Sequence, residues 1–177
     1  ARFDLIRCND TYSINILSIG FDARVGTDIA RFKRLPLVTG KGAYVLSILA
    51  NMVHGLSEHY VVTLDEAETV DGRWYGGGFN PVPEAEPDDG LLDVLLVKKV
   101  TLLQVPGVIG GYQKGRYADY PQLIRHVRCR RLRIRSDKPS VVNVDGEAIY
   151  TDDAQIELIP AAVRFFYPKG LQFRHKN

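Results

Sequence analysis

Two acidic turns in this sequence of 177 residues carry the side chains best suited to chemistry. The first turn is VVNVDGEAIY, residues 141–150, which places Asp145 and Glu147 on either side of Gly146. Because residues two apart in a strand share a face, Asn143 is expected beside Asp145. Such amide and carboxylate groups can act as a general base or hold a metal-bound phosphate. Asp-Gly between β-branched residues is also a strong hairpin signal, so a plain turn explains the same residues.

The second acidic turn is EAEPDDGLLDV, residues 84–94, where Asp88, Asp89 and Asp93 crowd the start of an apolar strand. Carboxylates and backbone carbonyls in such a loop are the oxygen ligands that Mg2+ and Ca2+ prefer. Asp and Gly also dominate turns for backbone reasons alone. The residues by themselves therefore leave both a metal site and a simple turn open.

The strongest charge run is RHVRCRRLRIR, residues 125–135. Here Arg131, Arg133 and Arg135 alternate with apolar residues, which places the three arginines on one face of a strand. Such a face can meet phosphates, nucleic acid or anionic lipid, although a solvated face of an antiparallel sheet explains it as well. The net charge of +2 is too small to indicate a nucleic-acid-binding protein as a whole, so any basic function is local.

No other motif supplies a complete site. The glycines of YGGGF, residues 75–79, allow close approach of a backbone, but the sequence lacks both the Walker spacing and GxGxxG. The four histidines lack ligand spacing, and nothing resembles a nucleophile elbow. The two cysteines form no CxxC pair, which excludes a disulfide framework and a zinc site and favours a reducing compartment. Without a run of apolar residues long enough to cross a bilayer, the chain is expected to be cytoplasmic.

Strands are the main elements expected to position these turns. Turn residues and β-branched runs predict strands over residues 2–7, 12–19, 59–65, 69–77, 91–100, 128–136, 140–145, 147–151, 154–160 and 163–168. Apolar residues at helical spacing predict a helix over 39–56 and a shorter one over 101–109. The spacing of the strands predicts a mainly β fold, an antiparallel β-sandwich with one or two peripheral helices, in a single domain over residues 1–177.

Five segments, taken in order, resemble the C-terminal half of the diacylglycerol kinase-like lipid kinase family, which includes bacterial lipid kinases and sphingosine kinases. They are GFDARV, TGKGAYVL, RWYGGGFNPVPEAEPDDGLLDVLLV, IRSDKPSVVNVDGE and IPAAVRFFYP. The resemblance implies a β-sandwich that shares a cleft with an N-terminal nucleotide-binding domain carrying a GGDGT-type motif. That motif is absent from the sequence, so we expect the N-terminal domain to be missing and the isolated chain to be inactive. GGGFNPVPEAEP departs from the more usual GGGM, which affects substrate preference more than fold.

The resemblance also assigns roles at the first turn. Glu147 is expected to accept the proton of a lipid hydroxyl, such as that of diacylglycerol, during transfer of the γ-phosphoryl group of ATP. Asp145 is expected to orient Glu147 or contact a metal, and Asn143 and Gly146 to lie close to the nucleotide.

At the second turn the resemblance implies a Mg2+ site. Asp89 is expected to bind the ion through its side chain, Asp88 to be a neighbour able to replace it, and Glu86 and Leu91 to contribute backbone oxygens.

The partners implied by the resemblance are a lipid substrate and the missing N-terminal domain, with ATP as co-substrate and no nucleic acid. A homodimer and peripheral contact with the membrane are compatible with this reading. Two alternatives from other classes remain: a non-enzymatic basic β module that binds anionic membrane or nucleic acid, and an NAD kinase-like domain.

Overall fold

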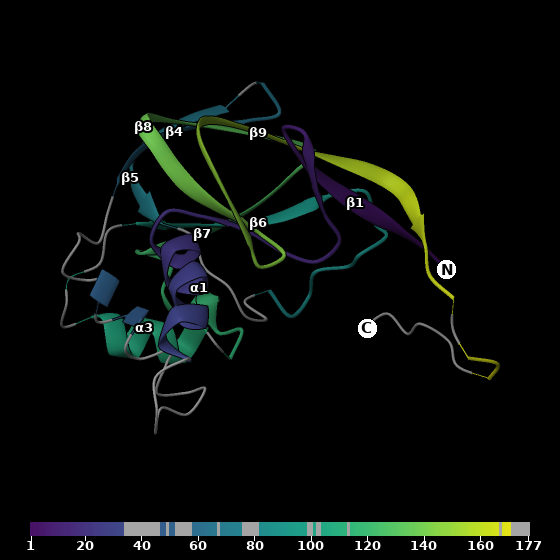
Figure 1. Cartoon of the computed structure of the whole chain (residues 1–177), viewed down its shortest axis with the longest axis horizontal. Helices are drawn as coiled ribbons and strands as arrows, with labels where there is room; N and C mark the ends of the chain where they lie inside the picture. Colours follow the sequence, from purple (N-terminus) through teal and green to yellow (C-terminus); the bar gives the residue numbers. More distant parts are fainter. Residues whose placement is uncertain are drawn as a thin grey trace.

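A computed structural model describes residues 1–33, 47–48, 50–51, 58–66, 68–75, 82–98, 101, 104–112, 114–166 and 168–170. Within these residues, nine strands hydrogen-bond into one antiparallel sheet (Figure 1). In chain order the strands are β1 (Arg2–Cys8), β2 (Thr11–Ser13), β3 (Leu17–Ile19), β4 (Glu58–Leu64), β5 (Glu68–Tyr75), β6 (Leu92–Lys98), β7 (Ile124–Cys129), β8 (Arg131–Val144) and β9 (Glu147–Arg164). Their order across the sheet is β2-β1-β9-β8-β4-β5-β6-β7, and β3 pairs with β8 off this path.

The helices of the described residues lie outside the sheet (Figure 1). They include α1 (Phe21–Phe32), α3 (Val105–Tyr112) and the short 3-10 helix η1 (Tyr117–Asp119). A small apolar cluster joins α1 and α3 to strands β6 and β7, with Val25 and Val108 facing Val97 and Ile124. The prediction of a mainly β, antiparallel fold with peripheral helices is confirmed.

The sheet curls so that distant strands share one core. Leu96 of β6 and Cys129 of β7 belong to the same buried cluster as Val62 of β4 and Val142 of β8. Three strands separate β7 from β8 along the sheet order, so the sheet must fold over for the side chains of these two strands to meet. The two packed layers expected of a sandwich are therefore built from one continuous sheet.

Both cysteines belong to this core and are unpaired. Burial raises the pKa of the Cys8 thiol to about 11. Burial, with smaller contributions from the charges of Asp65 and Asp93, raises the pKa of the Cys129 thiol to about 12. Both thiols are therefore protonated at neutral pH and unsuited to nucleophilic chemistry.

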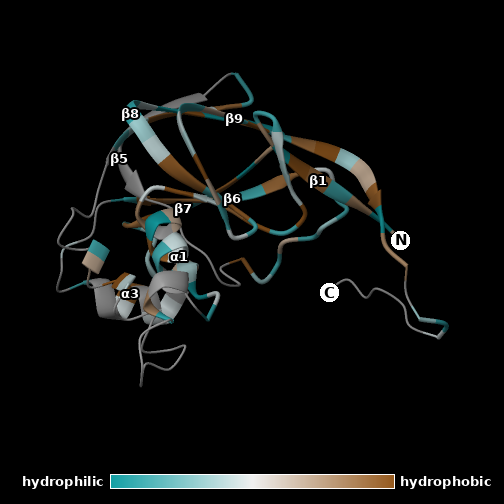
Figure 2. Ribbon diagram, in the orientation of Figure 1, coloured by the Kyte–Doolittle hydropathy of each residue, from teal (hydrophilic) through white to brown (hydrophobic). Residues whose placement is uncertain are grey.

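The burial of the residues of β8 changes along the long hairpin that this strand forms with β9. The first part of β8 alternates between exposed and covered residues, whereas its last residues, 140–144, are all buried. Figure 2 shows the same change as a hydrophilic start and a hydrophobic end of β8. The pairing with β9 shifts register between Arg135 and Ser140, which separates the two parts.

The strand predictions need two corrections. The single strand predicted over 12–19 is wrong, because β2 and β3 are separated by a turn at residues 14–16 that binds a distant carboxylate. The five separate strands predicted between residues 128 and 168 are also wrong in number, since β8 and β9 run through the predicted breaks. Register shifts keep these strands paired across irregular positions.

The helix predictions have mixed outcomes. The helix predicted over 101–109 exists but spans Val105–Tyr112, with Pro106 in its first turn, where a missing N–H costs little. Most of the helix predicted over 39–56 lies outside the described residues, although the described residues there, 47–48 and 50–51, are helical. In YGGGF, everything after Tyr75 also lies outside them. Helix α1 was not predicted.

Candidate functional site

The first acidic turn is the tip of the β8–β9 hairpin. Val144 pairs with Glu147, which leaves Asp145 and Gly146 as the two residues of the turn. Their φ angles of 49° and 101° lie in the left-handed region. Two-residue turns of this kind favour Asp-Gly, so the predicted hairpin is confirmed with the turn chemistry expected for it.

The carboxylate of Asp145 binds the turn between β2 and β3. Its Oδ1 accepts hydrogen bonds from the Ser13 hydroxyl at 2.9 Å and the Ile16 N–H at 2.8 Å. Its Oδ2 accepts one from the Ile14 N–H at 2.7 Å, and the Asp145 N–H donates to the Ile16 carbonyl at 3.0 Å. Asp145 therefore fastens the hairpin tip to a turn that lies far away in the sequence.

Asn143 supports the same tip from inside the protein. Its side chain is buried, and its Oδ1 accepts a hydrogen bond from the Gly146 N–H at 2.9 Å. On its other side Asn143 faces helix α1 at Gly26, where a Cβ atom would stand 3.2 Å from Asn143 Nδ2. The amide of Asn143 is thus engaged in holding the turn, and Gly26 allows the helix to approach it.

Glu147 and Asp145 are both exposed, and they differ in their partners. Glu147 is the first residue of β9, and no hydrogen bond or ion pair joins its side chain to the rest of the described chain. The structure therefore brings Asn143, Asp145 and Glu147 to one turn but gives them different surroundings. The first two hold the turn in place, and Glu147 carries a carboxylate that is available to a ligand.

The second acidic turn holds Asp89 between a backbone amide and a guanidinium. Asp89 Oδ1 accepts a hydrogen bond from the Leu91 N–H at 3.0 Å, and Oδ2 forms an ion pair with Arg128 of β7. Gly90, which lies between Asp89 and Leu91 in the sequence, has a φ of 77°. The neighbouring carboxylate of Asp88 is exposed, whereas Glu86 is half-buried.

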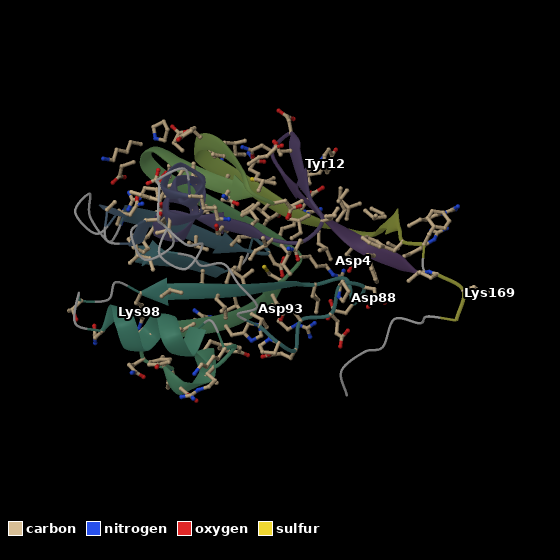
Figure 3. All side chains as sticks on the ribbon, turned by 60° about the horizontal axis from the view of Figure 1, so that its bottom comes forward. Asp4, Tyr12, Asp88, Asp93, Lys98 and Lys169 are labelled. Atoms are coloured by element: carbon tan, nitrogen blue, oxygen red, sulfur yellow. The ribbon has the colours of Figure 1, made fainter. Side chains whose placement is uncertain are left out.

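Asp4 of β1 fixes the backbone of this turn. The Asp4 N–H donates to the Pro87 carbonyl at 2.8 Å, and its Oδ2 accepts from the Gly90 N–H at 2.8 Å. The second oxygen accepts from the Ala161 N–H of β9 at 2.7 Å. Figure 3 shows Asp4 and Asp88 at the same end of the protein. The turn is thereby attached to the paired ends of β1 and β9.

A chain of polar side chains leads from this turn along β6 and β7. Arg128 Nε lies 3.3 Å from Asp93 Oδ1, and the same oxygen lies 2.8 Å from His126 Nε2. His126 Nδ1 lies 3.2 Å from the Tyr117 hydroxyl, which donates to Glu84. No role was predicted for His126. The signal in the sequence was that His126 and Arg128 stand two apart in one strand, so both can face Asp93 across the β6–β7 pair.

The acidic turn has donors of the right kind for a hard cation. Asp88 and Asp89 offer carboxylate oxygens, and the turn offers backbone carbonyls, which suit Mg2+ when water completes the coordination. Within the described residues, however, no three His, Cys, Asp or Glu side chains gather as a ready metal cluster. Arg128 also occupies one oxygen of Asp89 and would compete with a cation there.

The two acidic turns are separate features of the described structure. The first turn opens β9, whereas the second is bonded through Asp4 to the far end of that strand at Ala161.

Comparison with known proteins identifies the family. The model of the YegS C-terminal NAD kinase beta sandwich-like domain matches residues 15–167, which is most of the chain. The chain belongs to this family. The family's beta sandwich-like description agrees with the antiparallel sheet of this chain.

Individual relatives agree with this assignment. The chain is 30% identical over 175 residues to a probable lipid kinase YegS-like of Shewanella frigidimarina, covering 93% of this chain and 55% of that protein. It is 29% identical over 177 residues to a probable lipid kinase YegS-like of Alcanivorax borkumensis, covering 94% of this chain and 58% of the relative. The chain thus spans about half the length of these relatives.

Solved structures support the same fold. A crystal structure of a diacylglycerol kinase from Bacillus anthracis str. Sterne superposes with a TM-score of 0.57 at 15% sequence identity. The match covers 91% of this chain and 52% of that protein. Among the described residues, no helix has the length and apolar character needed to cross a membrane.

Proposed function

We propose that this chain is the substrate-side domain of an ATP-dependent lipid kinase that phosphorylates a lipid hydroxyl such as that of diacylglycerol. The observation that carries the proposal is an exposed Glu147 at the tip of a hairpin fixed on both sides, by Asp145 and by Asn143. The lipid kinase names of the relatives supply the reaction class. The nucleotide-binding domain needed for the reaction is expected to lie outside these 177 residues.

The chemistry assigned to Glu147 is proton acceptance. The lipid hydroxyl oxygen forms a bond to the γ-phosphorus of ATP while the bond from that phosphorus to the β,γ-bridging oxygen breaks, which releases ADP. The hydroxyl proton passes to the carboxylate of Glu147. Asp145 positions this carboxylate, because its bonds to Ile14 and Ile16 hold the turn from which Glu147 projects. Gly146 permits the tight turn, and its backbone N–H is bonded to Asn143.

The proposed Mg2+ site is the acidic turn, with Asp89 as side-chain ligand, Asp88 as its neighbour and backbone oxygens of Glu86 and Leu91. Oxygen donors in a turn fit a hard cation. When bound, Mg2+ supplies positive charge that stabilises the turn. We place the kinase in the cytoplasm, in peripheral contact with the membrane that holds its lipid substrate. The predicted homodimer stays a prediction.

The test uses a protein that joins this chain to its nucleotide-binding domain, supplied with diacylglycerol in mixed micelles and Mg-ATP. Transfer of labelled phosphate to lipid is the readout. We expect Glu147→Gln to lower kcat by about 10²–10⁴-fold while KM for ATP and the unfolding midpoint stay unchanged, because general-base catalysis has this magnitude. Asp152→Asn is the matched control, since Asp152 is another exposed carboxylate of β9.

Two results would overturn the proposal. One is a folded wild-type protein that phosphorylates neither diacylglycerol nor a related alcohol. The other is a Glu147→Gln variant with undiminished kcat. The alternative of an NAD kinase-like activity is tested in the same assay with NAD in place of lipid, and rests only on the family description of a NAD kinase beta sandwich-like domain.

A further inference from the structure

A groove of about 450 Å3 lies on the sheet at the other end of the β8–β9 hairpin from the Asp145–Gly146 turn. Four arginines line it: Arg7 from β1 and Arg131, Arg133 and Arg135 from β8. We call this feature the arginine groove. Its volume falls within the range of small-molecule sites. The arginine face predicted from the sequence is therefore a hollow in the surface.

The strands fix the positions of these arginines. Residues 131–135 of β8 pair with β9 on one side, and residues 132–136 pair with β4 on the other. Asp65, just after β4, accepts hydrogen bonds on Oδ1 from the backbone N–H groups of Arg130 at 2.9 Å and Arg131 at 2.8 Å. Guanidinium groups on paired strands are held closer to a binding geometry than groups on a loop.

Exposed ion pairs currently occupy three of the four guanidinium groups. These pairs are Arg7 with Glu157 at 2.8 Å, Arg131 with Glu66 at 3.1 Å, and Arg133 with Asp153 at 2.6 Å. Ion pairs with this much exposure add little to stability, so a stronger anion can replace a carboxylate at small cost. A phosphate offers more acceptor oxygens than a carboxylate and matches the planar guanidinium fork.

The local field of the groove is positive around Asp153. The hydrogen bond from Arg133 is the main cause that holds the pKa of Asp153 below its usual value, and the charges of Arg133 and Arg135 act in the same direction. Arg135 adds to this positive field through its charge. The four arginines also outnumber the three carboxylates paired with them.

We propose that the arginine groove binds a phosphate group, carried either by the headgroup of an anionic phospholipid or by a soluble phosphate ester. Side chains two apart in a strand lie about 7 Å apart, so one phosphate can contact two arginines of β8 at once. Arg7, across β9, closes the other side of the groove. This site does not rest on the proposed kinase activity, because it uses none of the residues assigned to that reaction.

The test measures binding of this chain to two probes over a series of salt concentrations. Flotation with mixed vesicles of phosphatidylcholine and phosphatidylglycerol, against pure phosphatidylcholine, reports a lipid headgroup. Calorimetric titration with glycerol 3-phosphate reports a soluble ester. We expect binding in at least one arm, weakening as salt rises, and a loss of affinity of tenfold or more in the double variant Arg131→Gln/Arg135→Gln.

Two further variants keep the outcome interpretable. Lys114→Gln/Arg116→Gln removes two exposed positive charges elsewhere, one of them from the exposed Arg116–Asp119 pair, and is expected to bind like the wild type. Arg131→Lys/Arg135→Lys keeps the charge without the guanidinium fork, and intermediate affinity is expected. Absence of binding in both arms, or an equal loss in the Lys114/Arg116 variant, would overturn the proposal.

Discussion

The two acidic turns share a sequence pattern but differ in what holds their carboxylates. Both contain Asp-Gly with glycine at positive φ, 101° at Gly146 and 77° at Gly90. At the hairpin tip, Asp145 is bound by neutral hydroxyl and backbone N–H groups, which leave its charge in place. At the other turn, Asp89 is paired with the Arg128 guanidinium, which neutralises it.

This difference separates two kinds of site. At the hairpin tip the hydrogen-bond donors to Asp145 are neutral groups, and the exposed Glu147 lies two residues further along the chain. A carboxylate held by arginine can bind a cation only if the arginine moves away. The same short motif therefore has its aspartate bound by neutral donors in one place and paired with an arginine in the other.

The largest expected change in the free energy of unfolding distinguishes the structural role of Asp145 from the chemical role proposed for Glu147. Asp145→Ala removes three hydrogen bonds to a charged group and should lower the free energy of unfolding by about 2–4 kcal/mol. Glu147→Ala should change it by less than about 0.5 kcal/mol, as expected of an exposed side chain. Urea unfolding followed by circular dichroism measures both values.

If Asp145→Ala and Glu147→Ala lowered the free energy of unfolding equally, the proposed difference between a structural Asp145 and a chemical Glu147 would be contradicted. A variant Asp145→Asn as stable as the wild type would also contradict this difference. One of the two terminal atoms of the Asn amide is a donor, so the amide cannot accept all three hydrogen bonds. Ser13→Ala serves as a smaller step, since it removes one of the three donors to Asp145 together with the contacts of the same hydroxyl to the Ile16 carbonyl and the Asn15 N–H.

A smaller effect is expected at the support of the second turn. Asp4→Ala removes hydrogen bonds to the Gly90 and Ala161 N–H groups and should cost about 1–2 kcal/mol, since solvent can replace part of each bond. Hydrogen exchange of these two amides should accelerate while that of the hairpin tip stays unchanged. Asp10→Ala, an exposed aspartate of the β1–β2 turn, is the control. Unchanged protection of Gly90 in Asp4→Ala would show that the carboxylate does not hold the turn.

The features predicted correctly from the sequence are those that depend on residues close together in the chain. The Asp145–Gly146 turn, the alternation of Arg131, Arg133 and Arg135, and the apolar strand after Asp89 are all local patterns, and the structure contains each of them. Helix α1 carries a local signal too, with Phe21, Val25, Ile29 and Phe32 at spacings of four, four and three. No helix was predicted over these residues, and the strand predicted before them ends ahead of Gly20.

The partners of the carboxylates could not be predicted in this way. Asp145 and Ile14 are 131 positions apart, and Asp4 and Gly90 are 86 apart, so only the sheet topology brings them together. The split between β2 and β3 has the same origin, because the turn at 14–16 forms around the Asp145 carboxylate. Residue type indicated that these aspartates matter, but not that two of them hold backbone in place.

The smallest effect tests the competition between arginine and cation at Asp89. Arg128→Gln removes the guanidinium and should strengthen Mg2+ binding by several-fold, because one carboxylate oxygen no longer has to exchange an ion pair for the metal. Calorimetric titration with MgCl2, together with the shift in Tm that Mg2+ causes, measures this change without any enzyme assay. Arg116→Gln, which breaks the comparable Arg116–Asp119 pair, should leave Mg2+ binding unchanged, and Asp89→Asn should abolish it. Mg2+ affinity that falls in Arg128→Gln would mean that the arginine organises the acidic turn for the ion, which would reverse the contrast drawn between the two turns.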